Sequence, residues 1–271
     1  MDSIMVLFSQ IACLLVIVAL GLFVFKKNPI KLQLREMILA SLFVVLALVV
    51  SYFSIMIPLF GFPSLKLSLS QIPLMCLGML LGPSYAFIAG IIYDLLGLVI
   101  NPTSFPFLGF TLNNILVCVI PALWYQYKYS KKNILTISMM VGIISTIVFT
   151  IYLWTYTDSV AFIDKYMELT VQMKMGITIA FIIFMILTMV VLGLWISKKQ
   201  DEEMLQWMFC LLMIEVFIHL CLSPLWLEIM YGIPYMVNFF MRIIKTVVVI
   251  PLFSVLGLPI VKLSKRLYKG V

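Results

Sequence analysis

Five ionisable residues stand inside long apolar stretches of this 271-residue chain. They are Asp94, Glu215, His219, Arg242 and Lys245. An ionisable side chain inside a membrane-spanning helix is costly unless it is paired or lines a polar cavity. Each is therefore a candidate for ligand binding or ion pairing, although a single histidine such as His219 is more often a packing residue.

The spacing of these residues places several of them on common helix faces. Glu215 and His219 are four residues apart and share one face. Asn238, Arg242 and Lys245 follow at intervals of four and three and share a face of another helix. Two interpretations follow: the polar faces line a pocket, or Glu215 and Arg242 neutralise each other as a buried pair.

The polar residues also fall at similar depths. With a helical rise of about 1.5 Å per residue, Asp94 lies about 9 Å below the outer end of its helix, and Glu215 and Arg242 about 12 Å below theirs. Asn113 and Asn114 lie about 9–10 Å below the outer start of another span. A common depth in several helices predicts a pocket that opens toward the outer face.

Two aromatic residues, Phe110 and Trp226, neighbour these polar positions. A flat ring there can stack on a planar ligand. Most other aromatic residues near the outer loops, such as Tyr235, are typical of the aromatic belt at a membrane interface. The sequence therefore predicts ligand-facing roles for Phe110 and Trp226.

Common motifs for catalysis and metal binding are absent from the sequence. It contains no G-x-x-x-x-G-K-[ST], H-E-x-x-H, G-x-S-x-G or C-x-x-C motif, and it has one histidine. We therefore expect no cofactor, no metal and no enzymatic activity. A membrane enzyme that uses Asp94, Glu215 and His219 as acid and base is the alternative from that class.

The elements that position these residues are predicted to be membrane-spanning helices. Hydrophobic residues make up 64% of the chain and charged residues 11%, which is unlike a soluble domain. The apolar runs are continuous and lack the alternation of barrel strands. Because a bilayer core needs about 20 apolar residues per helix, we expect nine spans. They cover residues 4–25, 36–57, 70–81, 84–100, 107–127, 133–156, 174–197, 204–223 and 235–260.

Basic residues support this count because they collect on one side of the predicted membrane. The clusters lie within residues 26–35, 128–132, 198–199 and 262–269. By the positive-inside rule that side is cytoplasmic, with the N-terminus outside and the C-terminus inside. These clusters also explain the net charge of +7, so we expect membrane lipid and no nucleic acid as a partner.

Six short motifs follow one another along the chain: Phe62–Ser68 with Ile72–Pro73, Gly78–Pro83, Asp94–Gly97, Gly109–Leu112, Leu225–Leu227 with Tyr231–Gly232, and Arg242–Lys245. In this order they resemble segments of the folate-specific S-components of bacterial energy-coupling-factor (ECF) vitamin transporters. The resemblance covers roughly residues 36–128 and 204–262. It implies an all-α integral membrane protein with a six-helix S-component core and about three additional transmembrane helices.

The resemblance also implies a function and partners. A protein of this kind binds a vitamin from outside the cell membrane and works with a transmembrane coupling subunit and two cytoplasmic ATPases. ATP is then used by the partners and not by this chain. A pteridine ring would suit stacking on Trp226 and Phe110 with amide contacts from Asn113 or Asn114. The carboxylates of a folate would suit Arg242 or Lys66, since a guanidinium grips a carboxylate with two hydrogen bonds.

The substrate-binding residues expected on these grounds share a position near the outer ends of the core helices. They are Lys66, Asp94, Phe110, Thr111, Asn113, Asn114, Glu215, Trp226, Tyr231, Arg242 and Lys245. Two alternatives to folate uptake remain open. The ligand is another vitamin such as thiamine or riboflavin, or the chain is a membrane accessory or assembly protein that transports nothing.

The chain departs from the family pattern in its added helices. We expect an extra N-terminal helix and basic linker at 1–35, core helices at 36–132, an inserted hairpin of two spans at 133–203, and the last core helices at 204–271. The small-residue A-x-x-x-A surface that docks the coupling subunit in the family is not clear here, because Ala40 is followed four residues later by Val44. Thr246 also replaces the asparagine that follows the lysine in the family's last helix.

Overall fold

The computed structural model describes residues 3–30, 32–59, 62–100, 106–127, 131–155, 159–162, 165–197 and 202–269. Helices account for most of them. In chain order these are α1 (Ser3–Lys27), α2 (Leu34–Tyr52), α3 (Gln71–Leu81), α4 (Pro83–Ile100), α5 (Leu108–Tyr127), α6 (Lys131–Thr155), α7 (Val171–Ser197), α8 (Glu202–Met213), the π-helix η1 (Ile214–Leu222), α9 (Ser223–Tyr231) and α10 (Tyr235–Lys269).

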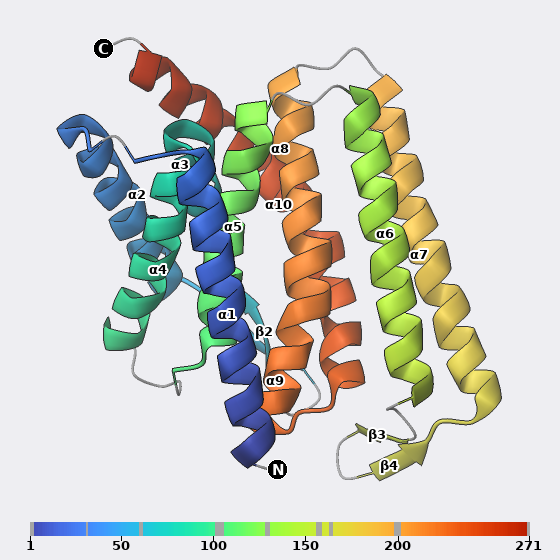
Figure 1. Ribbon diagram of the computed structural model, residues 1–271. Helices are drawn as coiled ribbons and strands as arrows, with labels where there is room; N and C mark the ends of the chain where they lie inside the picture. Colours follow the sequence, from blue (N-terminus) through green and yellow to red (C-terminus); the bar gives the residue numbers. More distant parts are fainter. Residues whose placement is uncertain are drawn as a thin grey trace.

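Each predicted span coincides with a helix, and successive spans alternate in direction (Figure 1). The described residues include five stretches long and apolar enough to cross a membrane, namely Ile4–Lys27, Leu34–Tyr52, Pro83–Ile100, Leu108–Gln126 and Glu203–Tyr231. Helix α1 begins at one end of the bundle and α10 finishes at the other, as an odd number of crossings requires (Figure 1). The predicted helical membrane fold is confirmed.

Three boundaries differ clearly from the prediction. The span expected at 235–260 belongs to a longer helix, α10, which continues to Lys269. The span expected at 36–57 ends at Tyr52, because the apolar residues that follow belong to a strand and not to the helix. Strand β1 (Ile55–Leu59) pairs antiparallel with β2 (Phe62–Leu67), and a second hairpin joins β3 (Ser159–Phe162) to β4 (Lys165–Glu168). The span expected at 204–223 continues to Tyr231, because α8, η1 and α9 follow one another without a break.

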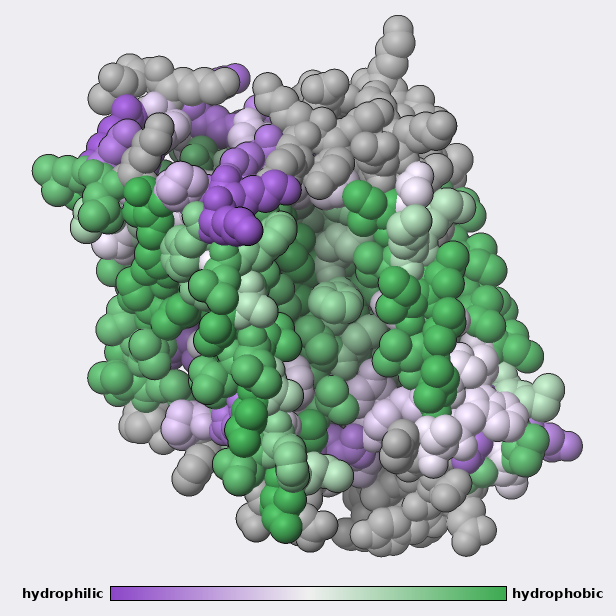
Figure 2. Space-filling model, viewed as in Figure 1, coloured by the Kyte–Doolittle hydropathy of each residue, from purple (hydrophilic) through white to green (hydrophobic). Residues whose placement is uncertain are grey.

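The outer surface of the bundle is apolar, as contact with lipid requires. Large side chains are widely exposed on it, for example Phe8 at 68% and Leu22 at 69% on α1. The face shown in Figure 2 carries a broad apolar band across its middle, and hydrophilic residues lie toward its upper and lower ends. In water such a band would drive aggregation, so this surface favours a multi-pass membrane protein.

Helices α3, α4 and α5 form the tightest part of the core because glycines let their backbones approach. A Cβ atom at Gly78 of α3 would stand 2.1 Å from the carbonyl oxygen of Cys118 in α5. A Cβ atom at Gly90 of α4 would stand 2.6 Å from the Cα of Ile115 in α5. Small residues at such crossings are typical of helix packing in membranes. They fix α5 at the centre of the core.

The additional helices lie on two sides of this core (Figure 1). Helix α1 contacts α4, α5 and α9, whereas α6 and α7 pair with each other and contact α8. Helix α6 also reaches η1, and its Tyr152 donates a hydrogen bond to the carboxylate of Glu228 on α9. The inserted pair is therefore attached to the same helical unit that carries Glu215 and Trp226.

Candidate functional site

A polar cavity of about 360 Å³ lies among the core helices, beside the end of β2. Helices α3, α4, α5, α9 and α10 and the π-helix η1 contribute side chains to its wall. The lining residues are Ser68, Ser70, Gln71, Leu74, Tyr93, Phe110, Asn113, Asn114, Val117, His219, Ser223, Leu227, Arg242 and Lys245. Five of the residues predicted from the sequence are among them: Phe110, Asn113, Asn114, Arg242 and Lys245.

One face of α5 forms a large part of the wall. Phe110, Asn113, Asn114 and Val117 all line the cavity. Their spacing of i, i+3, i+4 and i+7 is that of a single helix face. This helix therefore presents an aromatic ring, two amides and an apolar side chain to the same space.

Asp94 lies behind the cavity wall and accepts hydrogen bonds from two residues of α5. Its Oδ2 atom accepts a hydrogen bond from Thr111 Oγ1 at 2.6 Å, and its Oδ1 atom accepts one from Asn114 Nδ2 at 2.8 Å. Asp94 and Thr111 are both buried and do not line the cavity. The predicted residue thus finds its partners on α5, and it orients Asn114 instead of facing the cavity.

Asn113 connects α5 to α9. Its amide nitrogen donates to Ser223 Oγ at 3.1 Å, and its amide oxygen accepts a hydrogen bond from Trp226 Nε1 at 3.1 Å. The Trp226 ring packs against Phe107, with 5.7 Å between ring centroids, and does not line the cavity. The predicted stacking face of Trp226 is therefore occupied by protein, because its indole is drawn toward Phe107 and Asn113.

Arg242 and Lys245 bring positive charge to the floor of the cavity. They lie three residues apart on α10, and both line it. Arg242 Nη1 donates to the backbone oxygen of His219 at 3.2 Å. The amide of Gln71 and the imidazole Nε2 of His219 form a further hydrogen bond. The charged helix is thereby joined to η1, and η1 to α3.

Glu215 is fully buried and lies outside the lining of the cavity. Within the described part of the chain, neither of its carboxylate oxygens has a hydrogen-bond partner, so Glu215 and Arg242, the buried neutralising pair of the alternative interpretation, are not joined by a hydrogen bond. Lys245 and Arg242 still act on it electrostatically. The carboxylate offsets part of the positive charge from outside the cavity.

Glu215 and His219 both lie in η1, where hydrogen bonds run from residue i to i+5 and each turn is wider than in an α-helix. Residues four apart still lie on one side of such a helix, and Arg242 and Lys245 act electrostatically on both side chains. His219 alone lines the cavity. π-Helical turns often occur at functional sites.

Two further predicted residues do not contribute described side chains to the wall. Lys66 lies in β2 with its backbone opposite Met56, and its side chain is outside the described part of the structure. Tyr231 is the last residue of α9, is 49% exposed and is not among the lining residues. Its position fits an interfacial residue.

Sequence reasoning missed several lining residues. Tyr93 precedes Asp94, and Gln71 opens the apolar run of α3, so a polar residue next to a predicted site or span was the available signal. Ser68, Ser70, Ser223 and Leu227 carried no such signal, since serines and leucines are common near helix ends.

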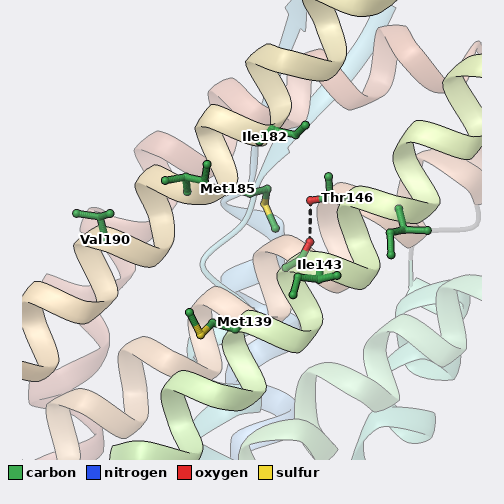
Figure 3. A pocket seen from close by; sticks show the side chains of 9 residues that line it. Met139, Ile143, Thr146, Ile182, Met185 and Val190 are labelled. Carbon is green, nitrogen blue, oxygen red and sulfur yellow. Dashed lines mark hydrogen bonds between the residues drawn. The ribbon is translucent and has the colours of Figure 1, made fainter.

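A second hollow lies between α6 and α7, and its lining side chains are almost all apolar, unlike those of the polar cavity (Figure 3). It measures about 630 Å³ and is lined by Met139, Gly142, Ile143, Thr146, Ile147, Ile182, Met185, Ile186 and Val190. The hydroxyl of Thr146 donates to the backbone oxygen of Gly142 at 2.8 Å (Figure 3). This apolar groove therefore offers no free polar group from its described lining residues.

The chain is similar to known proteins over most of its length. A family model described as "ECF transporter, substrate-specific component" matches residues 35–261. Among solved structures, one described as "Crystal structure of FolT bound with folic acid" is similar with a TM-score of 0.50 and 20% sequence identity, over 85% of this chain and 95% of that chain. At that identity the likeness concerns the fold. No curated protein matches the sequence.

Proposed function

Because the chain belongs to the family of substrate-specific components of ECF transporters, we propose that it is a vitamin-binding subunit and that its ligand is a folate. The observation that carries this proposal is the composition of the polar cavity. Two cationic side chains, Arg242 and Lys245, share it with the aromatic rings of Tyr93 and Phe110. A folate combines a planar ring system with carboxylates, and the cavity offers partners for both.

The charge of the wall favours an anion. Among the described lining residues, Arg242 and Lys245 carry the formal charges, while Asp94 is engaged by Thr111 and Asn114 behind the wall. A guanidinium and an ammonium at one site hold a carboxylate through charge-assisted hydrogen bonds. We assign the glutamate part of the ligand to the α10 side of the cavity.

The opposite wall favours a planar, hydrogen-bonding group. Phe110 and Tyr93 supply ring faces, and Asn114 supplies an amide whose orientation Asp94 fixes. Planar ligands stack on such rings, and amides pair with the edges of heterocycles. Trp226 supports this wall through Asn113 instead of stacking on the ligand.

The other vitamins weighed from the sequence fit less well. Thiamine carries a permanent positive charge, which Arg242 and Lys245 would repel. Riboflavin is planar but has no carboxylate for these two residues to hold. A folate therefore matches both the cationic and the aromatic side chains of the cavity, which neither thiamine nor riboflavin does.

The same proposal covers partners and orientation. We propose that the chain works with cytoplasmic ATPases through a membrane-embedded coupling subunit, and the absence of a P-loop motif from its own sequence agrees with this. We also propose that the N-terminus lies outside and the C-terminus in the cytoplasm of a bacterial cell, a topology that the basic clusters at 26–35 and 262–269 support. The cavity then opens toward the outside, where the vitamin arrives.

Binding measured on the purified protein tests the proposal. The protein in lipid nanodiscs should bind folic acid at submicromolar concentration in isothermal titration calorimetry. Thiamine and riboflavin should not compete with it. Absence of binding by folic acid and by a reduced folate at micromolar concentration would reject a folate ligand. Binding of no vitamin at all would favour an accessory protein.

A further inference from the structure

Helix α1 reaches the start of α5 through the side chain of Gln10. Its Nε2 atom donates to the backbone oxygen of Pro106 at 3.3 Å, and its Oε1 atom accepts a hydrogen bond from the backbone N–H of Leu108 at 3.0 Å. The two partners are 96 and 98 residues away in the sequence. A single amide thus joins the added helix to the start of α5.

The bond to Leu108 takes the place of a helix cap. Leu108 is the first residue of α5, and the first N–H groups of a helix have no partner within it. A side chain just before the helix usually satisfies one of them. Here α1 supplies the acceptor, so the start of α5 depends on a helix outside the region matched by the family model, residues 35–261.

Phe107 lies between the two backbone groups that Gln10 holds. Its side chain is buried, and its ring lies 5.8 Å from that of Phe110 and 5.7 Å from that of Trp226, measured between centroids. Gly109 leaves room for this cluster, since a Cβ atom there would stand 2.4 Å from Phe107 and 2.7 Å from Trp226. The position of Phe107 is therefore set closely from both sides.

The aromatic cluster of Phe107, Phe110 and Trp226 touches the cavity at two points. Phe110 lines the cavity directly, and Trp226 holds Asn113, which also lines it. A shift at Phe107 would reach both groups. Gln10 itself is not a lining residue, so any effect on the ligand passes through the cluster.

We propose that Gln10 is a positioning residue through which α1 fixes the start of α5 and slows the release of ligand from the cavity. The inference rests on the proposed function for the identity of the ligand, folic acid. It does not rest on that function for the link between α1 and α5.

The test replaces Gln10→Met, which keeps the length of the side chain and removes both hydrogen bonds. The amide protons at the start of α5 should then exchange with deuterium about fivefold faster, the factor expected for one lost hydrogen bond. Folic acid should dissociate about fivefold faster in stopped-flow fluorescence for the same reason. The matched control is Ser9→Ala, whose hydroxyl bonds only to Val6 of its own helix, and which should leave both rates unchanged.

A second variant separates the two bonds. Gln10→Glu retains an acceptor for Leu108 and loses the donor to Pro106, so its exchange at α5 should stay closer to the wild-type rate than that of Gln10→Met. If Gln10→Met does not fold, Gln10→Leu replaces it, because leucine also lacks both the donor and the acceptor.

Amide exchange at α5 and the rate of folic acid release test two different parts of the proposal. Unchanged exchange at α5 in both variants would overturn the link itself, whatever the ligand. Faster exchange with an unchanged rate of folic acid release would overturn the positioning role. If the wild-type protein binds no folate, the proposed function fails, and exchange alone still decides whether α1 holds α5.

Discussion

The two hollows of this bundle differ in chemistry far more than in size. The apolar groove between α6 and α7 is the larger, at about 630 Å³, but its lining consists of aliphatic and methionine side chains with one threonine and one glycine (Figure 3). The cavity at the core measures about 360 Å³ and carries Arg242, Lys245 and two asparagines. In a membrane, an apolar hollow is filled by lipid chains at no cost in unpaired polar groups. Cations kept inside the bundle need a partner, so the smaller hollow is the one that indicates a ligand.

The largest difference between the hollows should follow from removing a cation. Lys245→Met should weaken folic acid binding by about 10- to 100-fold, the value of a lost hydrogen bond between charged groups. Arg242 remains to offset the buried charge of Glu215, so the protein should still fold. Isothermal titration calorimetry gives the affinity. An unchanged affinity would show that the ligand does not reach the floor of the cavity.

Removing the negative charge of Glu215 tests the role of charge in folic acid binding from the opposite direction. Because this carboxylate lies outside the lining and opposes the charge of Arg242 and Lys245, Glu215→Gln should leave folic acid binding unchanged or tighten it. A large loss of affinity would place Glu215 among the groups that hold the ligand.

Asp94→Ala should affect stability as well as binding. Thr111 and Asn114 would each lose an acceptor while buried or half-buried, and an unpaired buried donor costs about 1–3 kcal/mol. A lowered melting temperature in detergent, measured by tryptophan fluorescence, is the expected result. Asp94→Asn keeps one acceptor and should therefore lower the melting temperature less than Asp94→Ala does. Equal melting temperatures for Asp94→Ala and the wild type would contradict the role given to this carboxylate.

A smaller effect is expected at Asn113. Asn113→Ala removes the hydrogen bonds to Ser223 and Trp226, each worth about 1 kcal/mol, and loosens α9 against α5. Affinity for folic acid should fall about fivefold for one such bond, and the fluorescence maximum of Trp226 should shift as its N–H loses its partner. An unchanged emission spectrum would argue against the link between α5 and α9.

The smallest effect belongs to the apolar groove. Thr146→Val removes the single hydroxyl among its described lining residues, and that hydroxyl bonds only to Gly142 of the same helix. Surface changes of this kind usually alter stability by less than about 0.5 kcal/mol. Folic acid affinity should match the wild type in calorimetry. Any marked loss would mean that the groove takes part in binding.

The sequence was informative where one helix face carries the site. The interval from Phe110 to Asn114 and the spacing of Arg242 and Lys245 both follow from α-helical geometry, and the structure places these residues at one cavity. The apolar runs likewise predicted the spans, since a bilayer sets their length. Local periodicity was sufficient for these features.

The sequence failed where neighbours decide the outcome. Nothing in Ile214–Leu222 predicts a π-helix, and no local pattern predicts that His219 lines the cavity while Glu215 lies outside its lining. Trp226 neighbours the polar residues along the chain, but its indole points to Asn113 and Phe107 because those groups satisfy its N–H and its ring. The role of Gln10 depends on partners almost 100 residues away, which no local pattern reveals.

If Arg242 holds a carboxylate of the ligand, a thermodynamic cycle should detect the contact. Folic acid and its dimethyl ester, in which both carboxylates are neutral, are titrated into the wild-type protein and into Arg242→Ala. The substitution should weaken the binding of folic acid by about 10- to 100-fold and leave the binding of the ester nearly unchanged. An equal loss of affinity for both ligands, or no loss for either, would mean that Arg242 does not hold a carboxylate.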